Sequence, residues 1–158
     1  MIADMLNNLA IGFAGASTLA NLGYALVGCL LGTLVGVLPG IGVVPTVAML
    51  LPLSFGMEPL SGLIMLAGIY YGAQYGGSTA AILVRMPGEA GSIVTALDGY
   101  EMARKGRAGS ALAIAALASF FAGTVATLLI AAFGPSLASL AMKFHSADYF
   151  SLMVLGLS

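Results

Sequence analysis

Hydrophobic residues run through this chain in stretches much longer than those of a soluble domain. Three segments, 5–57, 59–84 and 108–142, carry no formal charge. A helix needs roughly 20 apolar residues to cross a bilayer, whereas apolar runs of about 10 to 14 residues are typical of buried core helices. The pattern therefore predicts a membrane protein built from helices.

Four apolar elements follow from this pattern, at 22–38, 41–55, 60–84 and 108–133. Pro45 and Pro52 interrupt the second, and each removes a backbone hydrogen bond and kinks a helix. That element is either a short span or a re-entrant half-helix. The fold class expected is all-α: a polytopic helical membrane protein with helices broken at proline and glycine.

The whole chain is expected to form part of one membrane transport domain. Its predicted segments are an interfacial lead-in (1–21), a broken-helix region (22–84), a cytoplasmic loop (85–107), a transmembrane helix (108–133), and a link with the start of a next helix (134–158). The last apolar run, 151–158, is far shorter than the roughly 20 residues of a span. We therefore expect the chain to be a fragment.

Composition supports the membrane class and excludes several functions. The chain is 60% hydrophobic and 7% charged, with mean hydropathy +1.07, against roughly 25% charged residues in soluble domains. A net charge of −1 argues against a nucleic-acid partner. The charge-free runs lack Asp, Glu, His and Lys for acid–base or metal chemistry, and Cys29 and His145 are isolated, so we expect neither an enzyme nor a cofactor or metal centre.

Basic residues set the expected orientation. Four of the five lie within 85–107, namely Arg85, Arg104, Lys105 and Arg107. Because cytoplasmic loops are enriched in Lys and Arg, this segment is expected in the cytoplasm and the link 134–146 outside.

Small residues recur at every fourth position in three of the elements. The stripes are Gly28, Gly32, Gly36 and Gly40; Gly68, Gly72 and Gly76; and Ala111, Ala115, Ser119, Gly123, Thr127 and Ala131. Positions four apart share one helical face, and small faces let helices approach closely in lipid. Glycine is also common in membrane helices generally, but three stripes together predict a compact bundle.

The first motif that suggests a binding site is the break at 36–42. Pro39 lacks an N–H, and Gly40 and Gly42 tolerate positive φ, so one helix can end and another begin there. The new helix would present its N–H groups to an anion, with Thr46 one turn along. The alternative is a plain turn at the membrane surface.

The second motif is 70–79, which holds three tyrosines, Gln74, Ser78 and Thr79. The adjacent Gly76 and Gly77 permit a local break. These polar groups either line a solute path or, for the tyrosines, form an interfacial aromatic belt.

The third motif begins at Pro87-Gly88 and continues through Ser92, Thr95 and Asp98. Glycines, hydroxyls and carbonyls suit an oxygen-ligated sodium site or a nest for a carboxylate. The alternative is a solvated loop with a turn at 98–99.

Taken together, the motifs at 36–42, 70–78, 86–88 and 95–109 resemble the large membrane subunit of the tripartite tricarboxylate transporters. The resemblance implies an inverted-repeat secondary carrier of the bacterial inner membrane, of which this chain is the amino-terminal portion. It also implies symport of di- or tricarboxylates such as citrate with Na⁺ or H⁺. The implied partners are a small membrane subunit and a periplasmic solute-binding protein.

The motif positions supply the candidate site residues. Substrate contacts are expected at Gly40, Gly42, Thr46, Ser78 and Thr79, hinges at Pro39, Gly40, Gly76, Gly77, Pro87 and Gly88, and ion or substrate contacts at Ser92, Thr95, Asp98 and Arg85. The alternative interpretations are that Arg85 snorkels to the headgroups and that Asp98 caps a helix. A channel, or a structural subunit packing through small-residue faces, is the alternative function.

Overall fold

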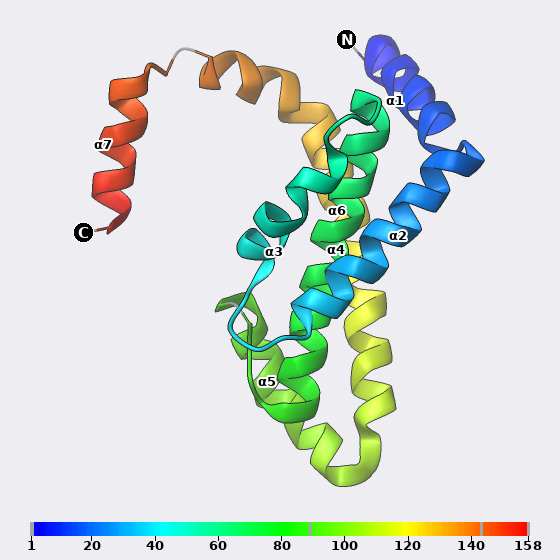
Figure 1. Ribbon diagram of the computed structural model, residues 1–158, viewed down its shortest axis with the longest axis vertical. Helices are drawn as coiled ribbons and strands as arrows, with labels where there is room; N and C mark the ends of the chain where they lie inside the picture. Colours follow the sequence, from blue (N-terminus) through cyan, green and yellow to red (C-terminus); the bar gives the residue numbers. More distant parts are fainter. Residues whose placement is uncertain (1, 89, 143, 158) are drawn as a thin grey trace.

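The computed structural model describes residues 2–88, 90–142 and 144–157, and in these residues all regular structure is helical (Figure 1). The all-α prediction is confirmed for this part of the chain. The elements are α1 (Ile2–Ala16), α2 (Leu19–Gly36), α3 (Val43–Leu50), η1 (Leu51–Ser54), α4 (Pro59–Val84), α5 (Ala90–Met102), η2 (Ala103–Arg107), α6 (Ala108–Ala141) and α7 (Ser146–Leu157).

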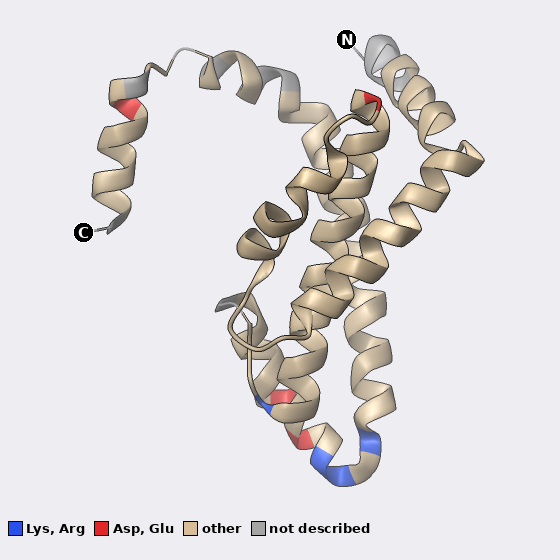
Figure 2. Cartoon of the chain, viewed as in Figure 1, with Lys and Arg blue, Asp and Glu red and all other residues tan. Residues whose placement is uncertain are grey.

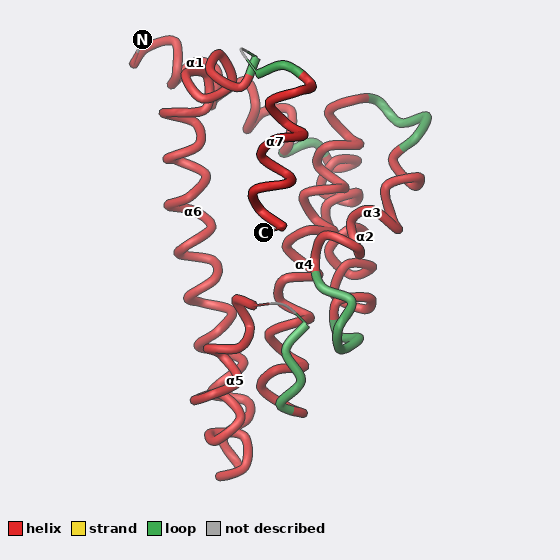
Figure 3. The backbone as a smooth tube through the Cα atoms, turned by 90° about the vertical axis from the view of Figure 1, so that its left-hand side faces the viewer, coloured by secondary structure: helices red, strands yellow, loops and turns green. Residues whose placement is uncertain are grey.

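The packing of α2 against α4 is the most extensive in the fold, and glycines make it (Figures 1 and 3). A Cβ atom on Gly76 would lie 2.6 Å from the carbonyl oxygen of Thr33, and one on Gly68 would lie 2.5 Å from that of Ala25. Gly32 meets the backbone of Ile69 in the same way. Because no side chain fits between these backbones, the two predicted stripes face each other and let the helices touch.

The third predicted stripe, on α6, is only partly covered by neighbouring helices. Ala111 is buried, whereas Ser119 and Thr127 are exposed. Near the middle of α6, Gly123 lies against the ring of Tyr71 from α4. The compact bundle therefore consists of α2, α4 and the neighbouring parts of α3, α5 and α6.

A buried polar cluster joins α1, α2 and α4. Ser61 Oγ donates to Asn21 Oδ1 at 2.7 Å, and Asn21 Nδ2 donates to the carbonyl oxygen of Gly15 at 2.9 Å. Thr18 caps α2 by accepting from the Asn21 backbone N–H at 3.3 Å. Burying polar groups is costly unless they are hydrogen-bonded. These bonds therefore hold the three helix ends in one arrangement.

Residues 85–107 are not the loop expected from the sequence. They form α5 and the short π-helical turn η2, and Asp98-Gly99 lies inside α5. Asp98 therefore caps no helix. The physical reason is a buried face: Ser92, Ala96 and Gly99 are buried, and Gly99 lies directly against Ile82 of α4. The chain reverses later, at Gly106, with φ 75° and ψ 12°.

The second apolar element forms α3 followed by η1, from Val43 to Ser54. At a rise of 1.5 Å per residue, even a fully α-helical segment of this length spans about 18 Å, less than the roughly 30 Å of a hydrocarbon core. The geometry favours a half-helix over a complete span. The helix tightens into 3-10 geometry where Pro52 enters.

Within the described residues, two helical stretches are long and apolar enough to cross a membrane. They are Leu19–Gly36, with mean hydropathy 1.7, and a stretch within Gly91–Gly134, with mean hydropathy 2.1. Figure 2 shows basic residues gathered at the turn between α5 and α6, where η2 carries Arg104, Lys105 and Arg107.

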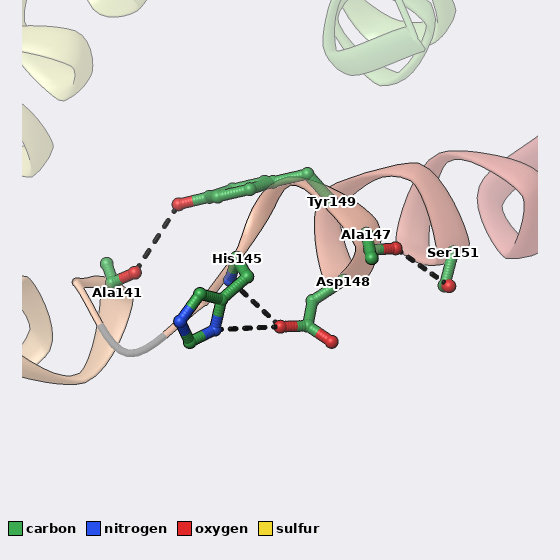
Figure 4. Close-up of polar contacts among 6 residues, drawn as sticks. All are labelled: Ala141, His145, Ala147, Asp148, Tyr149 and Ser151. Atoms are coloured by element: carbon green, nitrogen blue, oxygen red, sulfur yellow. Dashed lines mark hydrogen bonds and ion pairs between the residues drawn. The ribbon is translucent and has the colours of Figure 1, made fainter.

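The carboxyl-terminal part differs from the predicted link. α6 continues through Gly134 to Ala141, beyond the expected end at 133, and α7 stands apart from the bundle (Figure 1). The backbone N–H of His145 donates to Asp148 Oδ2 at 2.9 Å, and the His145 ring lies 3.8 Å from the same oxygen (Figure 4). His145 is thus exposed and belongs to the cap of α7.

Replacing Gly32 with leucine should separate α2 from α4. The new side chain would meet the backbone of Ile69, and overpacking of this kind costs about 1–3 kcal/mol. We expect a lower thermal unfolding midpoint for the detergent-solubilised protein. The matched control is Gly23→Leu on the same helix, because a Cβ there meets nothing within 4 Å. Equal midpoints for the two variants would contradict the glycine contact.

Candidate functional site

The two proline-glycine interruptions meet in space. A Cβ atom on Gly42 would lie 3.2 Å from the carbonyl oxygen of Gly88, and one on Gly88 would lie 3.7 Å from the backbone nitrogen of Gly42. Gly42 precedes α3 and Gly88 lies between α4 and α5. The connection after α2 therefore touches the connection after α4.

Gly77 of α4 lies beside this contact. A Cβ on Gly88 would lie 3.9 Å from the Gly77 Cα, and a Cβ on Gly77 would lie 3.6 Å from Ser92 Oγ and 3.9 Å from the carbonyl oxygen of Gly36. We call these five residues, Gly36, Gly42, Gly77, Gly88 and Ser92, the glycine junction. It joins the end of α2, the start of α3, the body of α4 and the first turns of α5.

The backbone at 36–42 explains why α2 stops there. Gly40 has φ 84° and Gly42 has φ 68°, a region that favours glycine. Pro39 supplies no N–H to continue the helix. Gly40 is exposed, and a Cβ on it would meet nothing within 4 Å. Gly40 therefore shapes the turn, while Gly42 makes the contact.

The predicted hydroxyl groups are already bonded to their own helices. Thr46 is fully buried, with 0% exposure, and its Oγ1 donates to the Gly42 carbonyl at 2.7 Å. Ser78 Oγ donates to the Gln74 carbonyl at 3.1 Å, and Thr79 Oγ1 to that of Tyr75 at 2.9 Å. Their oxygens keep free lone pairs, but their protons are engaged. Thr46 thus holds Gly42 in place at the start of α3.

The helix break expected at Gly76 and Gly77 is absent, because α4 is continuous from Pro59 to Val84. Gly76 is pressed against the backbone of Thr33 and Val37 on α2. Gly77, the next residue, faces the junction instead. Close backbone approach accounts for Gly76, whereas the nearest atoms to Gly77 lie at ordinary contact distances.

The tyrosines of α4 lie outside the junction. Tyr70 and Tyr71 are exposed, and their rings meet edge to face, with centroids 5.9 Å apart and an interplanar angle of 88°. Tyr75 is half-buried. Tyr71 contacts Gly123 of α6, so this ring serves packing between helices.

The third motif divides between two places. Ser92 faces the junction, whereas Thr95 and Asp98 line a separate open pocket of about 290 Å³ between α4, α5 and α6. The remaining lining is Ile82, Val94, Gly99, Met102, Ala111, Ile114 and Ala115. Asp98 is thus the one carboxylate in a pocket otherwise mostly apolar.

Arg85 does not reach the junction through any contact that the structure describes. It is exposed at the end of α4, with φ 57°, and its guanidinium carbon lies 5.6 Å from the centroid of the Tyr100 ring. This is a cation–π contact between α4 and α5.

Partial charges, rather than ionised side chains, therefore dominate the junction. The carbonyl end of α2 contributes negative potential, and the N–H end of α3 contributes positive potential. Within the described residues, no group of three or more His, Cys, Asp or Glu side chains comes together. The sequence analysis did not identify the Gly36 carbonyl oxygen as part of this site. The available signal was Pro39, three residues later, which has no N–H to donate to a carbonyl of the preceding turn.

Comparisons with known proteins identify the family. The model of the tripartite tricarboxylate transporter TctA family matches residues 22–158. The chain is 64% identical over 154 residues to the protein named "Uncharacterized 52.8 kDa protein in TAR-I ttuC' 3'region" of Agrobacterium vitis. That match covers 98% of this chain and 31% of the relative. No solved structure matches. The chain therefore belongs to the tripartite tricarboxylate transporter TctA family.

Proposed function

We propose that this chain forms part of the membrane subunit of a binding-protein-dependent importer for di- or tricarboxylates such as citrate, driven by a cation gradient. The observation that carries the proposal is the contact between two helix interruptions, in which a Cβ added to Gly42 would lie 3.2 Å from the Gly88 carbonyl oxygen. Interrupted membrane helices expose backbone groups that bind solutes at the interface of transporter repeats.

The start of α3 supplies the chemistry for an anion. The first N–H groups of a helix have no acceptor within it and carry a partial positive charge. At α3, Gly42 is the capping residue, and no side chain caps it. A substrate carboxylate placed against this end would accept hydrogen bonds there. The half-helix length of α3 supports a position within the membrane rather than at a surface.

The proposed assembly has three components. The membrane subunit works with a small membrane subunit and with a periplasmic solute-binding protein that captures the carboxylate. It lies in the bacterial inner membrane as a multi-pass protein, with the turn at Arg104, Lys105 and Arg107 on the cytoplasmic side. The coupling cation is Na⁺ or H⁺.

Reconstitution tests the function. The complete membrane subunit, placed in liposomes with its small membrane partner, should take up radiolabelled citrate only when the solute-binding protein and an inward cation gradient are both present. Uptake should saturate with substrate, as expected for a carrier. Uptake that continues without a gradient and rises linearly with citrate would indicate a channel and contradict the proposal.

Gly88→Leu in the complete subunit should reduce carboxylate uptake by about 100-fold, since a misplacement of about 1 Å at a reaction or binding centre has effects of that size. Its side chain would fill the space beside Gly42 and Gly77. The control is Gly109→Leu, where a Cβ meets nothing within 4 Å. Normal uptake by Gly88→Leu, at equal membrane abundance, would remove the junction from the solute pathway.

Arg104→Cys should react with an impermeant thiol reagent in inside-out vesicles and not in intact cells. The exposed Cys29 is first replaced by alanine to give an unreactive background. The positive-inside rule places the basic turn in the cytoplasm. Labelling in intact cells would reverse the proposed orientation.

A further inference from the structure

Two oxygen atoms without hydrogen-bond partners among the described residues lie beside Gly77. From the position that a Cβ would occupy on Gly77, Ser92 Oγ lies 3.6 Å away and the Gly36 carbonyl oxygen 3.9 Å away, and these are the only two contacts within 4 Å. The point between them is thus bordered by oxygen from α2 and α5.

The Gly36 carbonyl is left unpaired by the turn that follows α2. In the described chain, the N–H groups of Val37, Leu38 and Ile41 bond to the carbonyls of Thr33, Val35 and Leu38, and none bonds to Gly36. Pro39 has no N–H to offer. As the last residue of α2, Gly36 also lies at the negative end of the helix dipole.

The Ser92 hydroxyl is the second unpaired group. Ser92 is only 2% exposed, yet its Oγ makes no hydrogen bond to any described residue. No fully enclosed side-chain oxygen or nitrogen of the described chain lacks a partner, so the Ser92 oxygen keeps a small accessible surface. By contrast, Thr46, Ser78 and Thr79 all bond to their own helices. A buried hydroxyl left open in this way points to a ligand.

The geometry points to a sodium-ion site formed by the Gly36 carbonyl and the Ser92 hydroxyl over the bare backbone of Gly77. Helix carboxyl ends and unwound carbonyls coordinate Na⁺ in membrane carriers, whereas a carboxylate would be repelled by the Gly36 lone pairs. A divalent ion prefers carboxylate ligands, and the junction has none among its described residues.

This site rests on the proposed function for its role in transport. Gly88 lies between Gly77 and Gly42, so an ion above Gly77 would be adjacent to a carboxylate at the start of α3. Each charge would stabilise the other by Coulomb attraction. Binding of Na⁺ would therefore favour binding of the substrate, which is the coupling that a symporter needs.

Gly77→Ala tests the site with little disturbance of the fold. The new methyl group would contact both oxygens, at ordinary distances of 3.6 Å from Ser92 Oγ and 3.9 Å from the Gly36 carbonyl oxygen. The control is Gly62→Ala on the same helix, where a Cβ meets Ser54 at 3.5 and 3.6 Å. The readout is the thermal midpoint of the purified complete transporter in NaCl and in choline chloride at equal ionic strength.

Wild type and Gly62→Ala should be stabilised by Na⁺ and not by choline or K⁺, and Gly77→Ala should lose this stabilisation. Ser92→Ala should raise the Na⁺ concentration for half-maximal stabilisation by about tenfold, which corresponds to about 1.4 kcal/mol. Ser119→Ala, at an exposed position of α6, should not. A wild-type response to Na⁺ in both Gly77→Ala and Ser92→Ala would overturn the site.

The same measurements separate this site from the proposed function. Citrate uptake driven by protons, with no effect of Na⁺ on stability or transport, would overturn the sodium site and leave the importer intact. Sodium stabilisation that Gly77→Ala abolishes, in a transporter that moves no carboxylate, would support the site and reject the proposed function.

Discussion

The backbone contact between α2 and α4 is the constraint on which the rest of the structure depends. Gly32 on one helix and Gly72 on the other remove the side chains that would separate two backbones, so dispersion contacts replace the hydrophobic driving force that lipid does not provide. Because α2 ends at Gly36, where its backbone still lies against Ala73, the first interruption is placed against the body of α4.

The junction follows from that placement. α5 packs its small face on α4, which brings Ser92 and Gly88 to the same level as Gly36. Four chain segments then meet without a single ionised side chain among the junction residues. In an apolar environment, the partial charges at helix ends are screened weakly and so can bind ions. Ionised side chains would bind the same ions more tightly and release them more slowly. A carrier needs release as much as capture, so weak binding of this kind is consistent with the proposed function.

Other buried polar side chains of the fold differ from Ser92 because they are hydrogen-bonded within the protein. Asn21 and Ser61 bond to each other across two helices, and Asn21 also donates to the carbonyl oxygen of Gly15. The Thr46 hydroxyl donates its hydrogen bond to the Gly42 carbonyl oxygen. These groups stabilise fixed contacts, whereas Ser92 retains its hydrogen-bonding capacity.

The sequence by itself determined the helical class, the small-residue faces of α2 and α4, the interruption at Pro39-Gly40 and the family, because each depends on local periodicity, backbone chemistry or ordered motifs. It did not reveal that 85–107 forms a helix, that α4 runs unbroken through Gly76 and Gly77, or that Ser92 and Asp98 belong to different sites. Those outcomes depend on which faces are buried against neighbouring helices. Burial is set by contacts between residues distant in the chain, so only the tertiary structure decided them.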